Sequence, residues 1–247
     1  MESSQQITKI SLSNNIDSMT ISSETLFIED SFFSNCSKLE SIDVNLDNPQ
    51  FSSIDGILFT KDHKTLLCFP AKHNLSKYTI PASVTSIGES AFSNCSQLQS
   101  ITIPASVTTI GNSPFRSCPN LRSIEVDSNN LQYSSIDGIL FTKNCEKLLC
   151  FPAKHHLTNY EIPTTVTSIG DCAFSRCHNL QSITIPANVT SIGNSAFYEC
   201  YKLKSITIPN GVTSIGDSAF YSCSDLKSIT IPANVTSIGT SAFFCCL

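Results

Sequence analysis

Large apolar residues recur along this chain with a 23-residue period, as in the steps from Phe174 to Phe197 and from Phe197 to Phe220. The repeated unit reads L-x-S-I-T-I-P-x-x-V-T-S-I-G-x-S-A-F-x-x-C, as in the segment 203–223. A fixed period of this length predicts a stack of similar coils, because one coil alone cannot bury its apolar side chains. Two aligned columns show this step within each of two groups: Phe92 and Phe115, then Phe174, Phe197, Phe220 and Phe243; and Cys95 and Cys118, then Cys177, Cys200, Cys223 and Cys246.

A second, longer period is superimposed on the first. It separates Phe33 from Phe115 and Cys36 from Cys118. The segment Phe51–Pro81 matches Tyr133–Pro163 at 22 of 31 positions. We therefore expect a single solenoid over residues 1–247 that contains two duplicated units. Its expected parts are partial repeats over 1–24, duplicated units at 25–107 and 108–189 with hairpins at 52–70 and 134–152, and 23-residue repeats over 190–247.

Within one unit, alternation predicts a short strand that ends at a proline. Leu98, Ile101 and Ile103 share one side of this strand, and Ser100 and Thr102 share the other. Pro104 lacks a backbone donor and suits the end of the strand. Stacking predicts a repeat solenoid of ten to twelve coils, with a parallel β-sheet on the concave face and short turns or extended coils on the convex face. Gly111 is expected to provide a turn in the returning segment.

The duplicated segment departs from the 23-residue pattern. Gly56–Thr60 and Leu66–Phe69 are apolar runs separated by a polar stretch, which predicts an inserted β-hairpin, and the same holds in the second copy. Because the second run ends in proline, as the repeat strands do, we expect it to join the same sheet. The Asp55-Gly56 and Asp137-Gly138 pairs are interpreted as turns before the two inserted β-hairpins.

Composition excludes some partners. The chain is 40% hydrophobic and 14% charged, with a net charge of −5, and no cluster of Lys and Arg occurs. These values argue against nucleic acid and anionic membranes, because phosphate binding requires clustered positive charge. No apolar run approaches the roughly 20 residues of a membrane helix, so no membrane insertion is expected. Met1–Met19 has no apolar stretch of the kind found in export signals.

The repeat resembles the BspA-like leucine-rich repeat family, whose units look like the S-I-T-I-P-A-N-V-T-S-I-G-N-S-A-F-Y-E-C of Ser182–Cys200. The resemblance extends from about Thr20 to Leu247 and includes the I-D-G-I-L-F-T-K hairpin element. It implies a curved leucine-rich repeat solenoid at the cell surface or secreted, used in adhesion to host matrix proteins, host cells or other microbes. A cytoplasmic location is the alternative.

Candidate reactive residues favour structural interpretations. Half of the 12 cysteines fall in the 23-residue column, which indicates a buried thiol column, with Cys145 and Cys245 as the more reactive thiols. His73 and His155 are interpreted as loop residues copied with the hairpin. Asp55 and Asp137 lack a repeating catalytic partner, and no zinc motif occurs. We expect no enzyme activity, no cofactor and no metal.

The outward positions of the predicted strands form the candidate ligand-binding surface. They are rich in hydroxyl groups, which donate and accept hydrogen bonds but lack the aromatic and Arg anchors of strong interfaces. We expect weak, multivalent binding of a protein or glycoprotein here; the alternative is a solvated face with binding on the hairpins. The positions are Ser41, Asp43, Ser100, Thr102, Ser123, Glu125, Ser182, Thr184, Ser205, Thr207, Ser228 and Thr230.

A second hypothesis is structural. Phe243–Leu247 falls partway through a repeat, so a polar C-terminal cap is lacking in the printed sequence. Solenoid ends need caps to remain soluble. The alternative function is therefore a scaffold, in the cell or outside it, that assembles through this end, with a homodimer as its simplest form.

Overall fold

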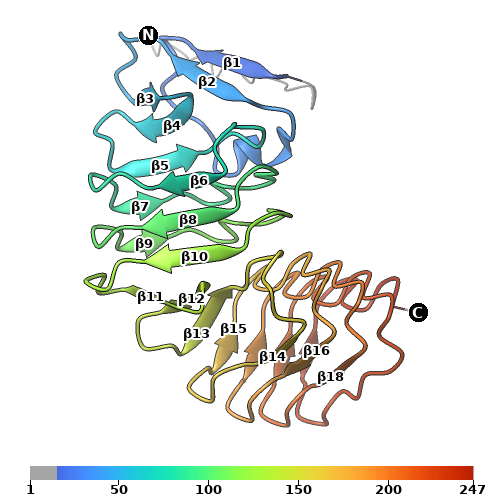
Figure 1. The fold of residues 1–247 in the computed structure, drawn as a ribbon. Coiled ribbons are helices and arrows are strands. Elements are labelled where there is room, and N and C mark those ends of the chain that lie inside the picture. Colours follow the sequence, from blue (N-terminus) through green and yellow to red (C-terminus); the bar gives the residue numbers. More distant parts are fainter. Residues whose placement is uncertain (1–15, 247) are drawn as a thin grey trace, which may run out of the picture.

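The computed structural model describes residues 16–246 as a β-solenoid of about ten turns (Figure 1). This confirms the predicted leucine-rich repeat solenoid with parallel strands. The stack changes direction at the strands β11–β13 (residues 133–150), so the strands of the two halves run in different directions in Figure 1. Most of the partial repeats expected over 1–24 lie outside the described residues, whereas Ile21 ends the first strand.

The L-x-S-I-T-I segments form parallel strands, which we call the major strands. Each pairs with the equivalent residues of the next coil, as in Ser182 with Ser205 and Thr184 with Thr207. They form three separate sheets, β1-β2, β6-β8-β10 and β14-β16-β18. The major strands are β1 (Ser18–Ile21), β2 (Ser41–Val44), β6 (Lys77–Thr79), β8 (Ser100–Ile103), β10 (Ser123–Val126), β14 (Asn159–Glu161), β16 (Ser182–Thr184) and β18 (Ser205–Thr207).

The V-T-S-I-G segments, expected as a returning coil, form a second series of parallel strands. We call these short elements the minor strands. Their isoleucines are buried in most coils and complete the core opposite the major strands. They are β7 (Ser86–Ile87), β9 (Thr109–Ile110), β15 (Ser168–Ile169), β17 (Ser191–Ile192), β19 (Ser214–Ile215) and β20 (Ser237–Ile238).

Each duplicated segment folds into three antiparallel strands. The third strand pairs in parallel with a minor strand, so the expectation that it joins the sheet of major strands is wrong. The reason is the position of Phe69, whose ring stacks on that of Phe92 at 5.3 Å and so belongs to the column of phenylalanines. In each coil the minor strand precedes the column phenylalanine, and the third strand precedes Phe69 in the same way. The strands are β3 (Phe51–Ile54), β4 (Ile57–Thr60), β5 (Thr65–Cys68), β11 (Tyr133–Ile136), β12 (Ile139–Thr142) and β13 (Lys147–Cys150).

The middle strand of each three-stranded unit separates two hydrophobic cores. Ile139 and Phe141 of β12 belong to the C-terminal core, whereas Leu140 belongs to the preceding one. Both faces of the strand are therefore buried. This explains why the Ile-Leu-Phe run is continuously apolar and does not alternate with polar residues.

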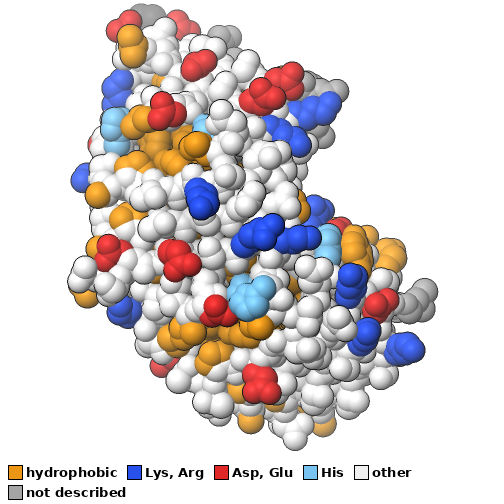
Figure 2. All heavy atoms as spheres, in the orientation of Figure 1, with side chains coloured by type: hydrophobic (Ala, Val, Ile, Leu, Met, Phe, Trp, Pro, Cys, Tyr) orange, Lys and Arg blue, Asp and Glu red, His pale blue; other side chains and the backbone are white. Residues whose placement is uncertain are grey.

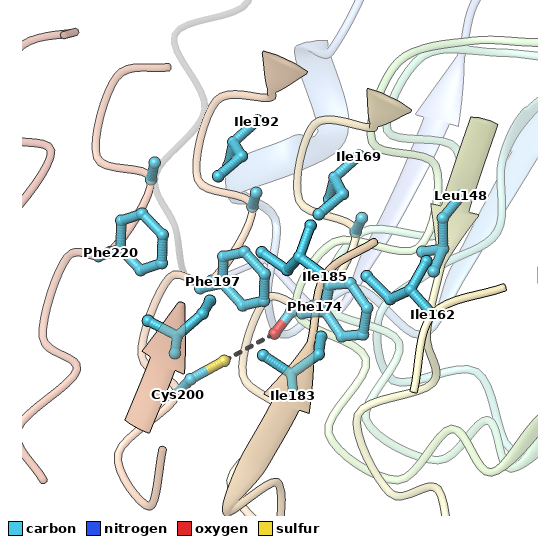
Figure 3. Close-up of a cluster of buried hydrophobic side chains, with 14 of the residues drawn as sticks. Leu148, Ile162, Ile169, Phe174, Ile183, Ile185, Ile192, Phe197, Cys200 and Phe220 are labelled. Carbon is cyan, nitrogen blue, oxygen red and sulfur yellow. Dashed lines mark hydrogen bonds between the residues drawn. The ribbon is translucent and has the colours of Figure 1, made fainter. Parts of the chain in front are cut away.

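Columns of identical residues fill the core of each coil (Figure 3). The rings of Phe174, Phe197 and Phe220 stack with centroids 5.0 and 5.1 Å apart and are fully buried. Ile183, Ile185 and other isoleucines surround them. The predicted columns are thus present as continuous stacks along the axis.

Two positions in and just before the F-x-x-C turns have left-handed backbone conformations in every coil from Ser90 onward, although neither is glycine; the first turn has only Ser31 in this conformation. In one coil these are Ser195 (φ 51°) and Glu199 (φ 55°). In other coils Cys172 occupies the position of Ser195, and Cys245 occupies the position of Glu199. Both cysteines therefore lie at repeated positions, although outside the column of buried cysteines. The first such turn contains the short 3₁₀ helix η1 (Phe32–Asn35).

The role expected of Gly111 is also corrected, because its φ is not in the left-handed region. A Cβ at this position would lie 2.5 Å from the backbone N of Glu89 in the neighbouring coil. Glycine is needed because two backbones approach closely, a cause that a single unit of sequence does not show.

Candidate binding surface

The outward side chains of the major strands lie where the alternation predicts. In β8, Ile101 and Ile103 are buried, whereas Ser100 and Thr102 reach the surface and are half-buried. In β16 and β18, Thr184 and Thr207 are exposed. We call the set of twelve outward residues the hydroxyl face.

The structure divides the hydroxyl face into separate parts. Adjacent strands bring Ser182 beside Ser205 and Thr102 beside Glu125, about 4.8 Å apart in the direction of pairing. The three sheets are separate, so no continuous ladder forms among the described residues. The members by sheet are Ser41 and Asp43; Ser100, Thr102, Ser123 and Glu125; and Ser182, Thr184, Ser205 and Thr207, while Ser228 and Thr230 follow the last sheet outside any strand.

An open hollow of about 530 Å³ lies where the first break in the sheets occurs. Its walls come from β2, from the turn between β3 and β4, and from the loop after β5. Charged and polar groups line it, among them Asp43, Asp55, Lys72 and Asn74. The break therefore adds to this face a concave feature with charged groups in its wall.

A buried histidine holds the two loops of this hollow together. The Nε2 of His73 lies 2.8 Å from the carbonyl oxygen of Asp55, and the Leu75 N–H donates to Nδ1 at 3.3 Å. A carbonyl only accepts, so Nε2 carries the proton. His155 makes the same two contacts with Asp137 and Leu157. These histidines, expected as copied loop residues, are ties between loops.

Stacked aromatic side chains form an edge that was not among the surfaces expected from the sequence. Tyr198, Tyr221 and Phe244 follow the column phenylalanines, and their ring centroids are 5.0 and 5.3 Å apart. Beside them, His178 stacks on Tyr201 at 4.8 Å. The signal was available in the sequence, since these three residues recur in step with the column phenylalanines. Tyrosine is enriched in binding hot spots.

The column cysteines are free thiols that form a hydrogen-bonded ladder. Cys200 Sγ donates to the carbonyl oxygen of Phe174 at 3.0 Å, and the other five column thiols make the equivalent bond (Figure 3). Burial raises the pKa of Cys177 and Cys200 well above the usual thiol value. Of the two thiols expected to be reactive, Cys245 is exposed and Cys145 is partly buried.

Among residues 16–246, the side chains of Asp137, His155 and His156 form a group with the donor atoms of a metal site. This group was not predicted from the sequence. In the same range, none of the helices has the length and apolarity that a membrane span requires.

A family model confirms the resemblance. The model of the BspA-type leucine-rich repeat region matches in 6 copies over residues 2–65, 66–149 and 147–247. The chain belongs to this family. Family membership indicates a protein-binding or surface repeat module, and solenoids of this kind are generally non-catalytic. A search of curated proteins gave no match.

Solved structures share the fold. A leucine-rich repeat protein from Eubacterium ventriosum is 21% identical with a TM-score of 0.53; the alignment covers 88% of this chain and 60% of that one. The pneumococcal vaccine antigen PcpA is 22% identical with a TM-score of 0.55, and the alignment covers 91% of this chain and 65% of that one. A leucine-rich cell surface protein from Faecalibacterium prausnitzii is 27% identical with a TM-score of 0.55, and the alignment covers 94% of this chain and 77% of that one. The chain thus spans less than two thirds of the first two structures.

Proposed function

We propose that this chain is a non-enzymatic module that binds a protein or glycoprotein ligand at the cell surface or after secretion. Its role would be adhesion to host matrix or cell-surface proteins or to other microbes. BspA-like proteins are often surface or secreted, and the Faecalibacterium relative is a cell surface protein.

The observation that carries the proposal is the aligned exposure of hydroxyl groups on β16 and β18. Thr184 and Thr207 lie in register on neighbouring strands, and their backbones are already paired within the sheet. Their side chains are exposed and make no hydrogen bond within residues 16–246, so their donors and acceptors face solvent. Such groups can bond a partner without first breaking contacts in the solenoid.

The test is binding to a panel of immobilised matrix proteins, with a triple variant Thr184→Lys, Thr207→Lys and Thr230→Lys. Long charged side chains would block the face and weaken binding at least tenfold, because several contacts are lost together.

The control is a matched triple variant at the three threonines that directly precede the minor strands β17, β19 and β20. Thr190, Thr213 and Thr236 are exposed, also repeat every 23 residues, and are replaced by Lys in the same way. Their hydroxyls donate to carbonyl oxygens of the preceding coil, so circular dichroism must show that this variant folds. This control gives the same change in net charge and should bind as the parent does. Equal binding by both variants and the parent would remove the hydroxyl face from the proposal.

The alternative function is end-to-end assembly as a scaffold, in which the apolar side chains of the last described coil would pack against a second copy of the chain. Ile231 and Ile238 are 40% and 48% exposed, whereas their equivalents one coil earlier, Ile208 and Ile215, are 4% and 1% exposed. An apolar surface of this kind is covered in the other coils by the next coil.

Sedimentation velocity over a concentration series distinguishes the two functions. Assembly predicts a sedimentation coefficient that rises with concentration, and Ile238→Lys should abolish the rise. A monomer at every concentration would contradict the scaffold and leave the binding module as the function.

A further inference from the structure

The second duplicated segment gathers two histidines and an aspartate at one point on the surface. Asp137 lies in the turn between β11 and β12, and His155 and His156 lie in the loop after β13. The Nε2 atoms of the two histidines are 3.7 and 3.9 Å from Asp137 Oδ2. Figure 2 shows histidine side chains beside an acidic one on the visible face, between the positions of β10 and β14 in Figure 1.

We propose that Asp137, His155 and His156 bind a divalent transition-metal ion such as Zn²⁺. Imidazole and carboxylate are ligands that suit Zn²⁺, Ni²⁺ and Cu²⁺. The three donor atoms lie within 4.8 Å of one another. Zinc bonds of roughly 2.0–2.2 Å place tetrahedral ligand atoms about 3.4 Å apart, so the donors are within a short movement of coordination.

The exposed members can make that movement. The side chains of Asp137 and His156 are 58% and 69% exposed, so both can rotate without repacking the core. The His155 side chain is only 2% exposed, and its ring packs 4.8 Å from that of Phe151. One ligand is therefore fixed by the fold, and the other two can close on the ion.

Coordination by His155 exchanges two hydrogen bonds for metal bonds. Its Nε2 proton now points to the carbonyl oxygen of Asp137 at 2.8 Å, and the ion takes the place of this proton. The ring proton moves to Nδ1, with no net release, and the long 3.3 Å bond from Leu157 N–H is lost. The carbonyl oxygen of Asp137 then faces the ion and is available as a further ligand.

The first duplicated segment lacks one of the three ligands. Asp55 and His73 have the same arrangement, with His73 Nε2 at 2.8 Å from the Asp55 carbonyl oxygen, but Asn74 stands where the second copy has His156. An amide is a poor ligand for these ions compared with imidazole. The chain is therefore expected to hold one ion, and it contains its own matched control.

The test is calorimetric titration of the full chain with ZnCl₂ under reducing conditions. The parent should bind one ion more than the variant His156→Asn, and the affinity of the site should fall at least tenfold in Asp137→Asn. Asn74→His should add a second site and raise the stoichiometry by one. Zinc bound by thiols contributes equally to every variant, because all of them keep the 12 cysteines.

Circular dichroism confirms that the variants fold, which is expected because residues 74, 137 and 156 are exposed. Equal stoichiometry in the parent and His156→Asn would overturn the proposal. So would a failure of Asn74→His to gain a site, since the same three residue types would then be insufficient in the same setting.

Discussion

At the residue scale, Asn130 is a buried side chain whose hydrogen-bonding positions are all used. Its Nδ2 donates to the carbonyl oxygens of Pro104 and Val107, both at 2.9 Å. Its Oδ1 accepts from the N–H groups of Gln132 and Tyr133. One side chain therefore ties the segment before β11 to the coil beneath it, and Asn48 does the same in the first duplicated unit.

Asn130→Asp should lower the free energy of unfolding by about 3 kcal/mol or more, because a carboxylate would face two carbonyl oxygens without donors. Urea denaturation measures the change. Asn129→Asp, at an exposed neighbour, should cost less than about 0.5 kcal/mol. A similar decrease in the free energy of unfolding in both variants would show that the four hydrogen bonds of Asn130 do not contribute to stability.

The buried thiols make stability depend on alkaline pH. Burial raises the pKa of Cys177, Cys200 and Cys223, the last to about 12. Unfolded thiols ionise near pH 8.5, so the stabilisation is complete below about that pH and is lost as the pH rises above it. We expect the free energy of unfolding to fall steeply between about pH 9 and 11.

Replacing one thiol tests this origin of the pH dependence. Each of these three thiols contributes about 1.4 kcal/mol per pH unit to the slope in this range. Cys200→Ala should reduce the slope by that amount, besides costing about 1 kcal/mol at neutral pH for the lost hydrogen bond. Urea titrations at fixed pH with a reductant measure both quantities. An unchanged slope would assign the alkaline unfolding to other groups.

At the scale of elements, a glycine turn attaches each three-stranded unit to the preceding coil. Gly138 has φ +73°, and a Cβ there would lie 2.8 Å from Ser123 Cβ. The carbonyl oxygen of Gly138 accepts from the Ile124 N–H at 2.8 Å. The unit thus docks on β10 through a point at which no side chain fits.

Gly138→Ala should destabilise the protein by about 2 kcal/mol or more, from backbone strain and the displaced contact with β10. Thermal melting followed by circular dichroism measures the loss. Ile136→Ala, at a 47% exposed position in the same turn region, is the control and should have the smaller effect. The reverse order would show that the close approach to Ser123 is relieved elsewhere.

These elements show what the sequence could and could not predict. The columns were predictable because every coil gives a position the same environment, as for Phe197 and Cys200. The sheet that the third strand of each three-stranded unit joins was not predictable. Pro70 suggested a major strand, whereas stacking of Phe69 places the strand in register with the minor strands. The proximity of Asp137 to His155 and His156 depends on how two loops meet after an antiparallel excursion, and no local pattern encodes that.

At the scale of the whole molecule, the three cores are stacked along the solenoid and separated by β4 and β12. Phe220 lies in the C-terminal core, whereas Phe92 lies in the middle one. In a stack of this kind each coil contacts only its neighbours, so a local loss need not spread through the chain.

Phe220→Ala should remove about 3–5 kcal/mol of local stability and expose the coils around β17–β20 to hydrogen exchange. Amides of β4 and β8, in the middle core, should keep their protection. Phe92→Ala is the matched variant and should reverse the order. Uniform loss of protection in either variant would show that the solenoid unfolds as one unit.

The spacing of bonds between coils also has a genetic consequence. The N–H of Thr190 donates to Thr167, that of Thr213 to Thr190, and that of Thr236 to Thr213, always 23 residues apart. Deleting residues 187–209 would therefore set Thr213 over Thr167 with this backbone bond restored. Unequal crossing-over between the gene segments that encode these repeats would lengthen or shorten the protein by whole coils. Selection on such alleles would then act on the length of the solenoid and not on its ability to fold.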